Sequence, residues 1–326
     1  QAICAKFQRD HGISYAPEEI IVSTGGKQVI FNALMATIDP GDEAIIPAPC
    51  WVSYPDIVQL AEGRPVIVPC GPNQGFKITP AQLEAAITPR TKWFILNSPC
   101  NPTGAAYTRE ELAALAEVLL QHPGVWVFSD DIYEKLTYDG AKPVTMVEVE
   151  PRLRERTVTM NGCSKAYAMT GWRIGFCGGP KALIKAMDKL QSQSTSNASS
   201  ISQAAAVEAL TGPQDFIAEM VAVYRERRDL VVAALNECPG IVCGKPEGAF
   251  YVFASIHGCL GKTSAGGRKI ETDEDFVTAL LEEEGVAAVH GTAFIAPGHM
   301  RISYATSTAA LREACARIKR FCEGLH

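Results

Sequence analysis

Short apolar runs alternate with amphipathic segments through the first two thirds of the chain, a pattern typical of βα units around a mostly parallel sheet. The runs are continuously apolar, as expected for strands that are buried on both faces. Two helices are predicted among them, over residues 28–38 and 109–121, and the Asp-Pro-Gly-Asp segment 39–42 ends the first. The predicted strands are 44–47, 65–68, 93–96, 125–128, 157–160 and 174–177.

The pattern changes after about residue 224. A charged helical segment is followed by residues that predict a strand, a loop, a helix, a strand and a helix, with a Gly-, Ser- and Thr-rich surface loop over 258–268. We therefore expect an α/β large domain over residues 1–225 and a smaller C-terminal domain over 226–326. The chain opens on apolar residues at helical spacing without an initiator Met, so we expect it to begin inside a helix.

Composition narrows the class of protein. The 326 residues are 47% hydrophobic and 20% charged, and 30 Lys and Arg against 36 Asp and Glu give a net charge of -6. These values are typical of a folded globular protein and argue against a nonspecific nucleic-acid binder, which needs clustered basic residues. No apolar run reaches the roughly 20 residues that span a membrane. Small-molecule chemistry is the favoured function.

Eleven Cys and six His are scattered along the chain without CxxC or HExxH spacing. We predict no metal site, because ligands of structural and catalytic zinc recur at characteristic short spacings. With no secretory signal ahead of them, the thiols are expected to be reduced, and we expect a cytoplasmic protein.

Polar, glycine-rich or proline-rich segments follow several of the predicted strands, namely 98–104, 129–131 and 161–165. In open α/β sheets the ligand crevice lies outside the carboxyl ends of the strands. We therefore look for functional side chains in these segments.

Lys165 and Asp130 each have two interpretations on the residues alone. Small neighbours would let the Lys165 amine lie desolvated in a crevice as a nucleophile, although most loop lysines are solvated. Asp130 either caps the segment that follows it or directs a carboxylate into the crevice.

Three further features are also ambiguous by themselves. The Thr-Gly-Gly-Lys-Gln turn at 24–28, between a strand and a helix, is either a phosphate site or a plain tight turn. Arg173 and Arg301 lie beside apolar runs, where they would hold a phosphate or carboxylate or form structural ion pairs. Trp51 is either a core residue or a platform for a ring.

Taken together and in order, these segments resemble fold-type I pyridoxal-phosphate-dependent aminotransferases of the aspartate aminotransferase-like group (class I/II). The resemblance covers nearly the whole chain. It implies a large domain with a mostly parallel mixed sheet between helices, and a smaller α+β C-terminal domain. The matching stretches are Thr-Gly-Gly-Lys-Gln (24–28), Pro-Cys-Trp-Val-Ser-Tyr (49–54), Asn-Ser-Pro-Cys-Asn-Pro-Thr-Gly (97–104), Ser-Asp-Asp-Ile-Tyr-Glu (129–134), Ser-Lys-Ala-Tyr-Ala-Met-Thr-Gly-Trp-Arg-Ile-Gly (164–175), Gly-Ala-Phe-Tyr (248–251) and Arg-Ile-Ser-Tyr-Ala (301–305).

The resemblance implies roles for the residues that would contact pyridoxal 5'-phosphate. Lys165 would form a Schiff base with the cofactor and then move the proton between the substrate Cα and the cofactor. Asp130 would pair with the pyridinium nitrogen and keep it protonated. Tyr133 and Asn101 would hydrogen-bond the phenolic oxygen of the ring, and Trp51 would stack on its face.

The same resemblance assigns the phosphate group to Gly25, Gly26 and Lys27, whose backbone amides would donate to it, and to Arg173. Ser164, beside the lysine, would also belong to the cofactor site.

Substrate recognition is implied as well, with Arg301 gripping the α-carboxylate and Trp51 and Asn101 lining the substrate site. Lys27 would meet the distal carboxylate of aspartate or glutamate. We therefore expect an aminotransferase that moves an amino group from these donors to a 2-oxo acid by a ping-pong route through pyridoxamine phosphate. Related enzymes accept prephenate or aromatic keto acids, so these remain alternatives, as does a pyridoxal-phosphate-dependent lyase. A noncatalytic ligand-binding module on the same fold is a further alternative.

The resemblance also implies a homodimer with shared active sites, in which the segment 193–197 reaches the neighbouring subunit. Two departures from the family pattern stand out. Asp131 replaces the usual Glu after the critical carboxylate, a change from which we expect little effect. Family members also begin with an N-terminal arm and helix, whereas this chain starts after them, which would affect closure over the substrate.

Overall fold

The computed structural model describes all 326 residues, Gln1–His326. They divide into two compact units, one made of residues 1–47, 53–99 and 107–217 and the other of residues 48–52, 100–106 and 218–326. The domain boundary that we predict after residue 225 lies inside helix α9 (Asp215–Asn236). The division into two domains at this residue stays a prediction. No helix has the length and apolar composition needed to cross a bilayer.

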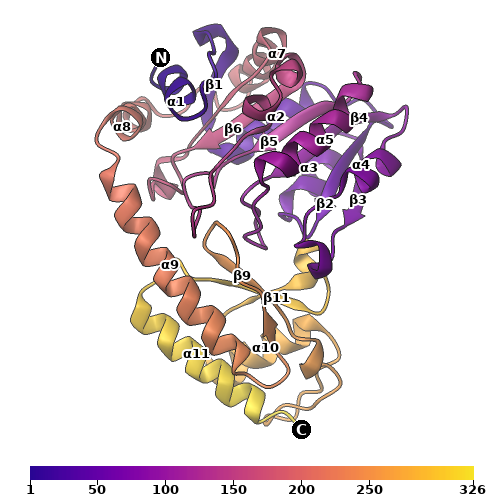
Figure 1. Cartoon of the computed structure of the whole chain (residues 1–326), viewed down its shortest axis with the longest axis vertical. Coiled ribbons are helices and arrows are strands. Elements are labelled where there is room, and N and C mark those ends of the chain that lie inside the picture. The colour runs from indigo at the N-terminus through magenta and orange to yellow at the C-terminus, as the bar shows by residue number, and fades with distance from the viewer. The chain divides into compact units, whose positions relative to one another are not determined.

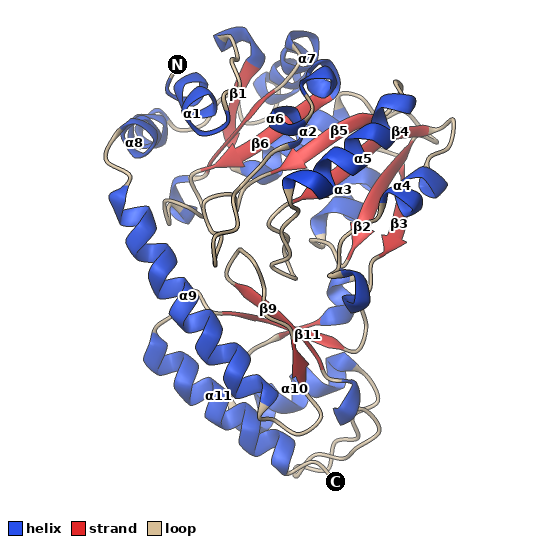
Figure 2. Ribbon diagram, viewed as in Figure 1, coloured by secondary structure: helices blue, strands red, loops and turns tan.

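A seven-stranded mixed sheet forms the centre of the first unit, in the order β1-β7-β6-β5-β4-β2-β3 (Figures 1 and 2). Strands β2, β4, β5 and β6 pair in parallel, whereas β7 is antiparallel to both β6 and β1. The six predicted strands are confirmed to within two residues at each end, and the strand expected before residue 24 is β1. The strands are β1 (Ile20–Thr24), β2 (Glu43–Ala48), β3 (Arg64–Pro69), β4 (Thr91–Asn97), β5 (Trp126–Asp130), β6 (Thr157–Gly162) and β7 (Ile174–Gly178).

Helices cover this sheet because its strands are apolar on both faces. In β4, Phe94 and Leu96 join a buried cluster with α5, whereas the indole of Trp93, the residue before Phe94, donates 2.9 Å to Thr37 Oγ1, just after α2. The alternation of side chains along a strand therefore gives each face its own core. The helices of this unit are α1 (Ala2–His11), α2 (Gly26–Met35), α3 (Ser53–Leu60), α4 (Pro80–Ala86), α5 (Arg109–Gln121), α6 (Met146–Val149), α7 (Lys181–Ser192) and α8 (Ser200–Thr211).

The second unit contains a four-stranded antiparallel sheet in the order β10-β11-β9-β8, with helices α10 and α11 and most of α9. The alternation of strands and helices that the sequence predicts is confirmed. Segment 258–268 is largely irregular, although Cys259 and Ser264 are buried within it. The elements are β8 (Val242–Cys243), β9 (Tyr251–Ser255), α10 (Asp273–Glu284), β10 (Val289–His290), β11 (His299–Ser303) and α11 (Thr308–Glu323).

Candidate active site

Five strands bring their functional segments to one edge of the seven-stranded sheet. Strands β4, β5 and β6 are parallel, so their carboxyl ends meet there. Because β7 runs antiparallel, its first residues lie at the same edge, beside the end of β1. The aligned pairs are Asn97 with Asp130, Asp130 with Met160, Gly162 with Gly175, and Thr24 with Ile174.

Asp130 is the buried carboxylate of this edge, with 3% of its surface exposed at the end of β5. Its Oδ2 accepts a 2.5 Å hydrogen bond from Tyr54 Oη, and its Oδ1 accepts a 3.2 Å bond from the Ile132 amide. Burial raises the pKa of Asp130 to about 6, while the Tyr54 and Ile132 donors and the charge of Lys165 act in the opposite direction. Asp130 therefore both orders the chain after it and keeps a carboxylate at the edge.

Lys165 lies in the turn after β6, two residues beyond Cys163, whose amide donates 3.1 Å to the Ile174 carbonyl. Its side chain is half-buried, and its Nζ lies 5.5 Å from the centroid of the buried Tyr133 ring. The structure thus brings Lys165, Tyr133 and Asp130 together at one edge, as the resemblance implies. Ser164, the neighbour of Lys165, is also half-buried.

The glycine turn between β1 and α2 forms a cradle with Arg173. Helix α2 begins at Gly26 without a side-chain cap, and its N-cap Gly25 has a φ of 89°. A Cβ on Gly25 would lie 2.3 Å from Arg173 Nη2, so a guanidinium packs directly against the uncapped helix N-terminus. A helix N-terminus and an arginine together favour an anion such as phosphate.

Two contacts refine this cradle. The Gly25 amide donates 2.8 Å to the Ser23 carbonyl, so this predicted donor is already paired within the turn. The exposed Lys27 lies in the first turn of α2. Gln28 Nε2 donates 2.7 Å to Thr195 Oγ1, which connects the turn to the exposed segment 193–197.

The remaining predicted residues lie in the second unit. Arg301, on β11, donates from Nη1 to Asn101 Oδ1 at 2.8 Å. Its guanidinium carbon lies 4.5 Å from the centroid of the Tyr251 ring and 4.8 Å from that of Phe294. Two aromatic faces and an amide therefore hold the guanidinium in one orientation. Trp51 is half-buried in the same unit.

Sequence reasoning missed Tyr54, which lies inside a quoted motif but received no role. Its hydroxyl is the strongest neutral donor to Asp130, and the pairing joins residues 76 positions apart. No local pattern reveals such a contact, although a Tyr that follows the predicted strand 44–47 at a sheet edge was the available signal.

The chain matches the family model described as aminotransferase class I and II over residues 1–318. An aspartate/prephenate aminotransferase of Cereibacter sphaeroides is 62% identical over all of this chain and 81% of its own length. The crystal structure of the aspartate aminotransferase from Rhizobium meliloti superposes with a TM-score of 0.97 at 56% identity, covering 100% of this chain and 81% of that one. That of a Thermus thermophilus aspartate aminotransferase with maleate has a TM-score of 0.89 at 44% identity, covering 98% and 80%. The chain belongs to the class I and II aminotransferases, and it has their fold-type I architecture.

Proposed function

We propose that this chain is a pyridoxal 5'-phosphate-dependent aminotransferase that takes the amino group of aspartate or glutamate and passes it to a 2-oxo acid in two half-reactions. One observation carries the proposal. The buried Asp130 ends β5, and Lys165 lies in the turn that follows β6, the neighbouring parallel strand, at the same edge of the sheet. The family match supports the transfer of amino groups, since class I and II members are aminotransferases.

Residues of the first unit fit three groups of pyridoxal phosphate, namely its phosphate, its ring nitrogen and its aldehyde. The uncapped N-terminus of α2 and Arg173 fit its phosphate, and the crowded Gly25 leaves the space that a side chain would fill. Asp130 fits the ring nitrogen, and Lys165 fits the aldehyde. When bound, this group supplies an electron sink for the negative charge that develops at the substrate Cα.

Asp130 would hold a proton on the ring nitrogen that faces it. Burial raises the pKa of this carboxyl to about 6 against the lowering effect of its donors and of Lys165, and a cation beside it would favour the ionised form further. Tyr54 donates to one carboxylate oxygen and the Ile132 amide to the other, so both oxygens have a fixed direction. This arrangement would keep the proton at the nitrogen, where the positive charge is needed.

Lys165 would move the other proton. As a neutral amine, its Nζ would take a proton from the substrate Cα and deliver it to the carbon that derives from the cofactor aldehyde. Tyr133, whose ring lies 5.5 Å from Nζ, would donate its hydroxyl to the phenolic oxygen of the cofactor, together with Asn101. Trp51 would pack on the ring face. These assignments remain proposals.

The proposal of a dicarboxylic amino acid as the substrate rests on two positively charged side chains. Arg301 presents a fixed fork that suits the α-carboxylate common to all amino acids. Lys27 would meet the second carboxylate of aspartate or glutamate. In support, a structural relative from Thermus thermophilus has been crystallised with maleate, which is a dicarboxylate.

Prephenate is a second candidate amino acceptor, because the relative from Cereibacter sphaeroides is named an aspartate/prephenate aminotransferase. Prephenate is a 2-oxo acid with a second carboxylate on its ring, so it offers Arg301 and Lys27 the same two charges. Comparison of 2-oxoglutarate and prephenate as acceptors, with aspartate as the donor, distinguishes the two.

We further propose a homodimer with shared active sites. Large apolar side chains are exposed on α8 and at the start of α9, with Ile201 82%, Val207 50% and Phe216 43% exposed. A second copy of the chain would cover such a surface. Light scattering of the purified protein measures the mass directly, and a monomer at micromolar concentration would contradict this assignment.

The compartment is also a proposal. All eleven cysteines are free thiols, and all but Cys4 and Cys100 are buried. This favours a reducing compartment, and we assign the enzyme to the cytoplasm.

The absorbance spectrum of the protein with pyridoxal phosphate tests the main proposal. We expect a band from the lysine-bound cofactor, its conversion to the pyridoxamine form by L-aspartate without any oxo acid, and its return with an oxo acid. Lys165→Ala should lack the lysine-bound band. A band that persists in this variant would overturn the site, and release of a product without formation of the amine form would favour a lyase.

A further inference from the structure

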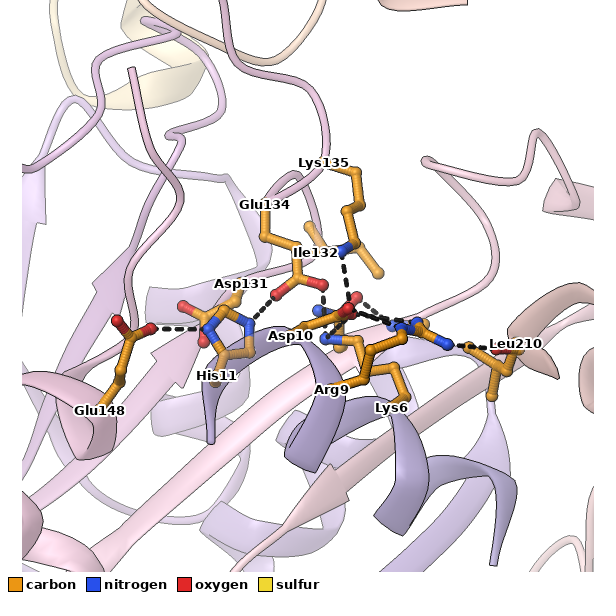
Figure 3. Close-up of polar contacts among 12 residues, drawn as sticks. Lys6, Arg9, Asp10, His11, Asp131, Ile132, Glu134, Lys135, Glu148 and Leu210 are labelled. Carbon is orange, nitrogen blue, oxygen red and sulfur yellow. Dashed lines mark hydrogen bonds and ion pairs between the residues drawn. The ribbon is translucent and has the colours of Figure 1, made fainter. Parts of the chain in front are cut away.

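The segment from the end of β5 onward directs nearby side chains to different neighbours. Asp130 and Tyr133 carry proposed cofactor contacts, whereas Glu134 is turned toward helix α1 (Figure 3). The loop is tight, because the Glu134 amide donates 2.9 Å to the Asp131 carbonyl and the Leu136 amide donates 2.8 Å to the Tyr133 carbonyl. Movement of Glu134 would therefore move Tyr133.

Two buried cations of α1 hold Glu134. His11 Nε2 lies 2.6 Å from Glu134 Oε2, and Lys6 Nζ forms an ion pair with Glu134 Oε1. The side chains of Lys6 and His11 are each only 2% exposed, and that of Glu134 is 5% exposed. Lys6 and His11 lie five residues apart on the helix, and they engage the two oxygens of one carboxylate.

The clasp has an outer layer of opposite charges. His11 Nδ1 lies 2.8 Å from Glu148 Oε2, so the imidazole bridges two carboxylates. Asp10 lies 3.7 Å from Lys6 and 2.9 Å from Lys135, the residue after Glu134. Figure 3 shows His11 between Glu134 and Glu148, with the Lys6 ammonium beside Glu134 and Asp10.

These contacts favour a charged imidazole. Burial alone lowers the pKa of His11, but the hydrogen bonds and charges of Glu134 and Glu148 raise it above its usual value. Likewise, burial would raise the pKa of Glu134, but Lys6 and His11 together hold the pKa of this carboxyl well below its usual range. The two cations and the carboxylate therefore stabilise one another's charges, as a buried carboxylate requires.

We propose that Lys6, His11 and Glu134 form a clasp that fixes the turn from Asp130 to Tyr133, and thereby positions the two side chains that set the charge state of the cofactor ring. These three are positioning residues, and the proposal rests on the proposed function of Asp130 and Tyr133. A hydrophobic contact would hold α1 against the loop equally well, but it would not fix the direction of the Glu134 carboxylate, which directly follows Tyr133 in the chain.

The test compares His11→Gln and Glu134→Gln with a matched control, His122→Gln. The control removes a pair of the same chemistry, in which His122 Nε2 lies 3.0 Å from Glu84 Oε1, but both partners are far more exposed. In the cofactor-free protein we expect hydrogen exchange of the amides at 131–136 to be about tenfold faster in the clasp variants, because their opening free energy falls. In the control, exchange at 131–136 should be unchanged.

The second readout is the pH titration of the absorbance of lysine-bound cofactor, which Asp130 and Tyr133 would govern. We expect its midpoint to shift by about half a pH unit or more in the clasp variants. Lower thermal stability with unchanged exchange at 131–136 and an unchanged midpoint would mean a merely structural role and would overturn the proposal.

Glu148→Gln provides the test if the inner variants fail to fold, because it keeps the contacts of Glu134 and removes the outer partner of His11 together with the ion pair between Glu148 and the half-exposed Arg109. It should change both readouts in the same direction by a smaller amount, and no change would contradict the clasp. If the wild-type protein shows no band that depends on Lys165, the proposed function fails, whereas faster exchange in the variants would still report on the clasp itself.

Discussion

Asp130 and Asp131 are adjacent buried carboxyls with different tasks. Burial raises the pKa of Asp130 to about 6 and that of Asp131 to about 7. Asp130 has donors on both oxygens, whereas Asp131 accepts a 2.9 Å bond from Ser129 Oγ at one oxygen. The donors to Asp130 therefore stabilise its charged form beside a cation. Asp131 has fewer donors, so its environment favours the neutral form.

Tyr54→Phe should make Asp130 harder to ionise. The variant removes the 2.5 Å donor that lowers the pKa of this carboxyl, so burial is opposed less. A hydrogen bond to a charged group contributes about 1.5 kcal/mol or more, so the acid limb of kcat/KM should move up by about one pH unit. Measurement of kcat/KM against pH in both proteins checks this. An unshifted limb would show that Tyr54 does not control Asp130.

Asp131→Asn should stabilise the cofactor-free protein at alkaline pH. The folded-state pKa of Asp131, about 7, lies above the usual 3.8, so ionisation opposes folding as pH rises between these values. An amide mimics the neutral acid. Urea denaturation should show a gain that is about 2 kcal/mol larger near pH 8 than near pH 5, because only part of the ionisation penalty is present at pH 5. An equal gain at both pH values would point to a cause other than ionisation.

At the scale of elements, local signals predicted helix and strand positions better than helix ends or distant contacts. Helix α5 begins and ends as predicted, because the capping box of Thr108 and Glu111 is local. Helix α2 starts two residues before the prediction, at an N-cap glycine, and ends three residues early although Ile38 is still buried. Apolar periodicity records burial, and burial continues beyond the helix.

The site shows the same division between local and distant information. Lys165 and Asp130 could be found because functional side chains follow strand ends, and the ordered motifs resolved their alternatives. The contacts of Tyr54 with Asp130 and of His11 with Glu134 join segments 76 and 123 positions apart. Such pairings depend on how helices pack on the sheet, which no local pattern encodes.

Gly25→Ala should weaken cofactor binding, because it changes the turn between β1 and α2. An added Cβ would lie 2.3 Å from Arg173 Nη2, so the guanidinium must move away from the N-terminus of α2. We expect the dissociation constant for pyridoxal phosphate to rise by about tenfold or more, measured by fluorescence titration.

Gly41→Ala is the matched control, because Gly41 has a φ of 93° and nothing within 4 Å of an added Cβ. Both variants bear a similar backbone strain of about 1 kcal/mol, but only Gly25→Ala crowds the arginine. Equal cofactor affinities in the two variants would remove the phosphate assignment.

At the scale of the whole molecule, the buried ionisable groups together determine how the free energy of unfolding depends on pH. The pKa of His11 is raised, so the stability it contributes is complete below about 6.5 and is lost as pH rises through its folded value. The raised pKa of Asp131 acts in the same direction. The lowered pKa of Glu134 acts oppositely, because its contribution is complete above about 4.5 and is lost as pH falls.

The cofactor-free protein should therefore be most stable in mild acid. Between about pH 5 and 8 the folded state holds more protons than the unfolded chain, so the free energy of unfolding should decrease across this interval. His11 is surrounded by Lys6, Asp131, Glu134 and Glu148, and the profile reports on this whole group. Denaturation at half-unit pH steps measures it, and stability that rises toward pH 8 would contradict the charged imidazole.

Substrate choice also belongs to this scale, because it depends on two cations that lie far apart in the sequence. Arg301 would bind the α-carboxylate of every donor, whereas Lys27 would bind only a distal carboxylate. Lys27→Gln should therefore reduce kcat/KM for aspartate by about tenfold to a hundredfold and leave alanine nearly unchanged. Arg301→Gln should reduce both by similar factors, since it removes an interaction that both donors share. Equal losses for the two donors in Lys27→Gln would remove the dicarboxylate assignment, and the aminotransferase assignment would then rest on Lys165 and Asp130.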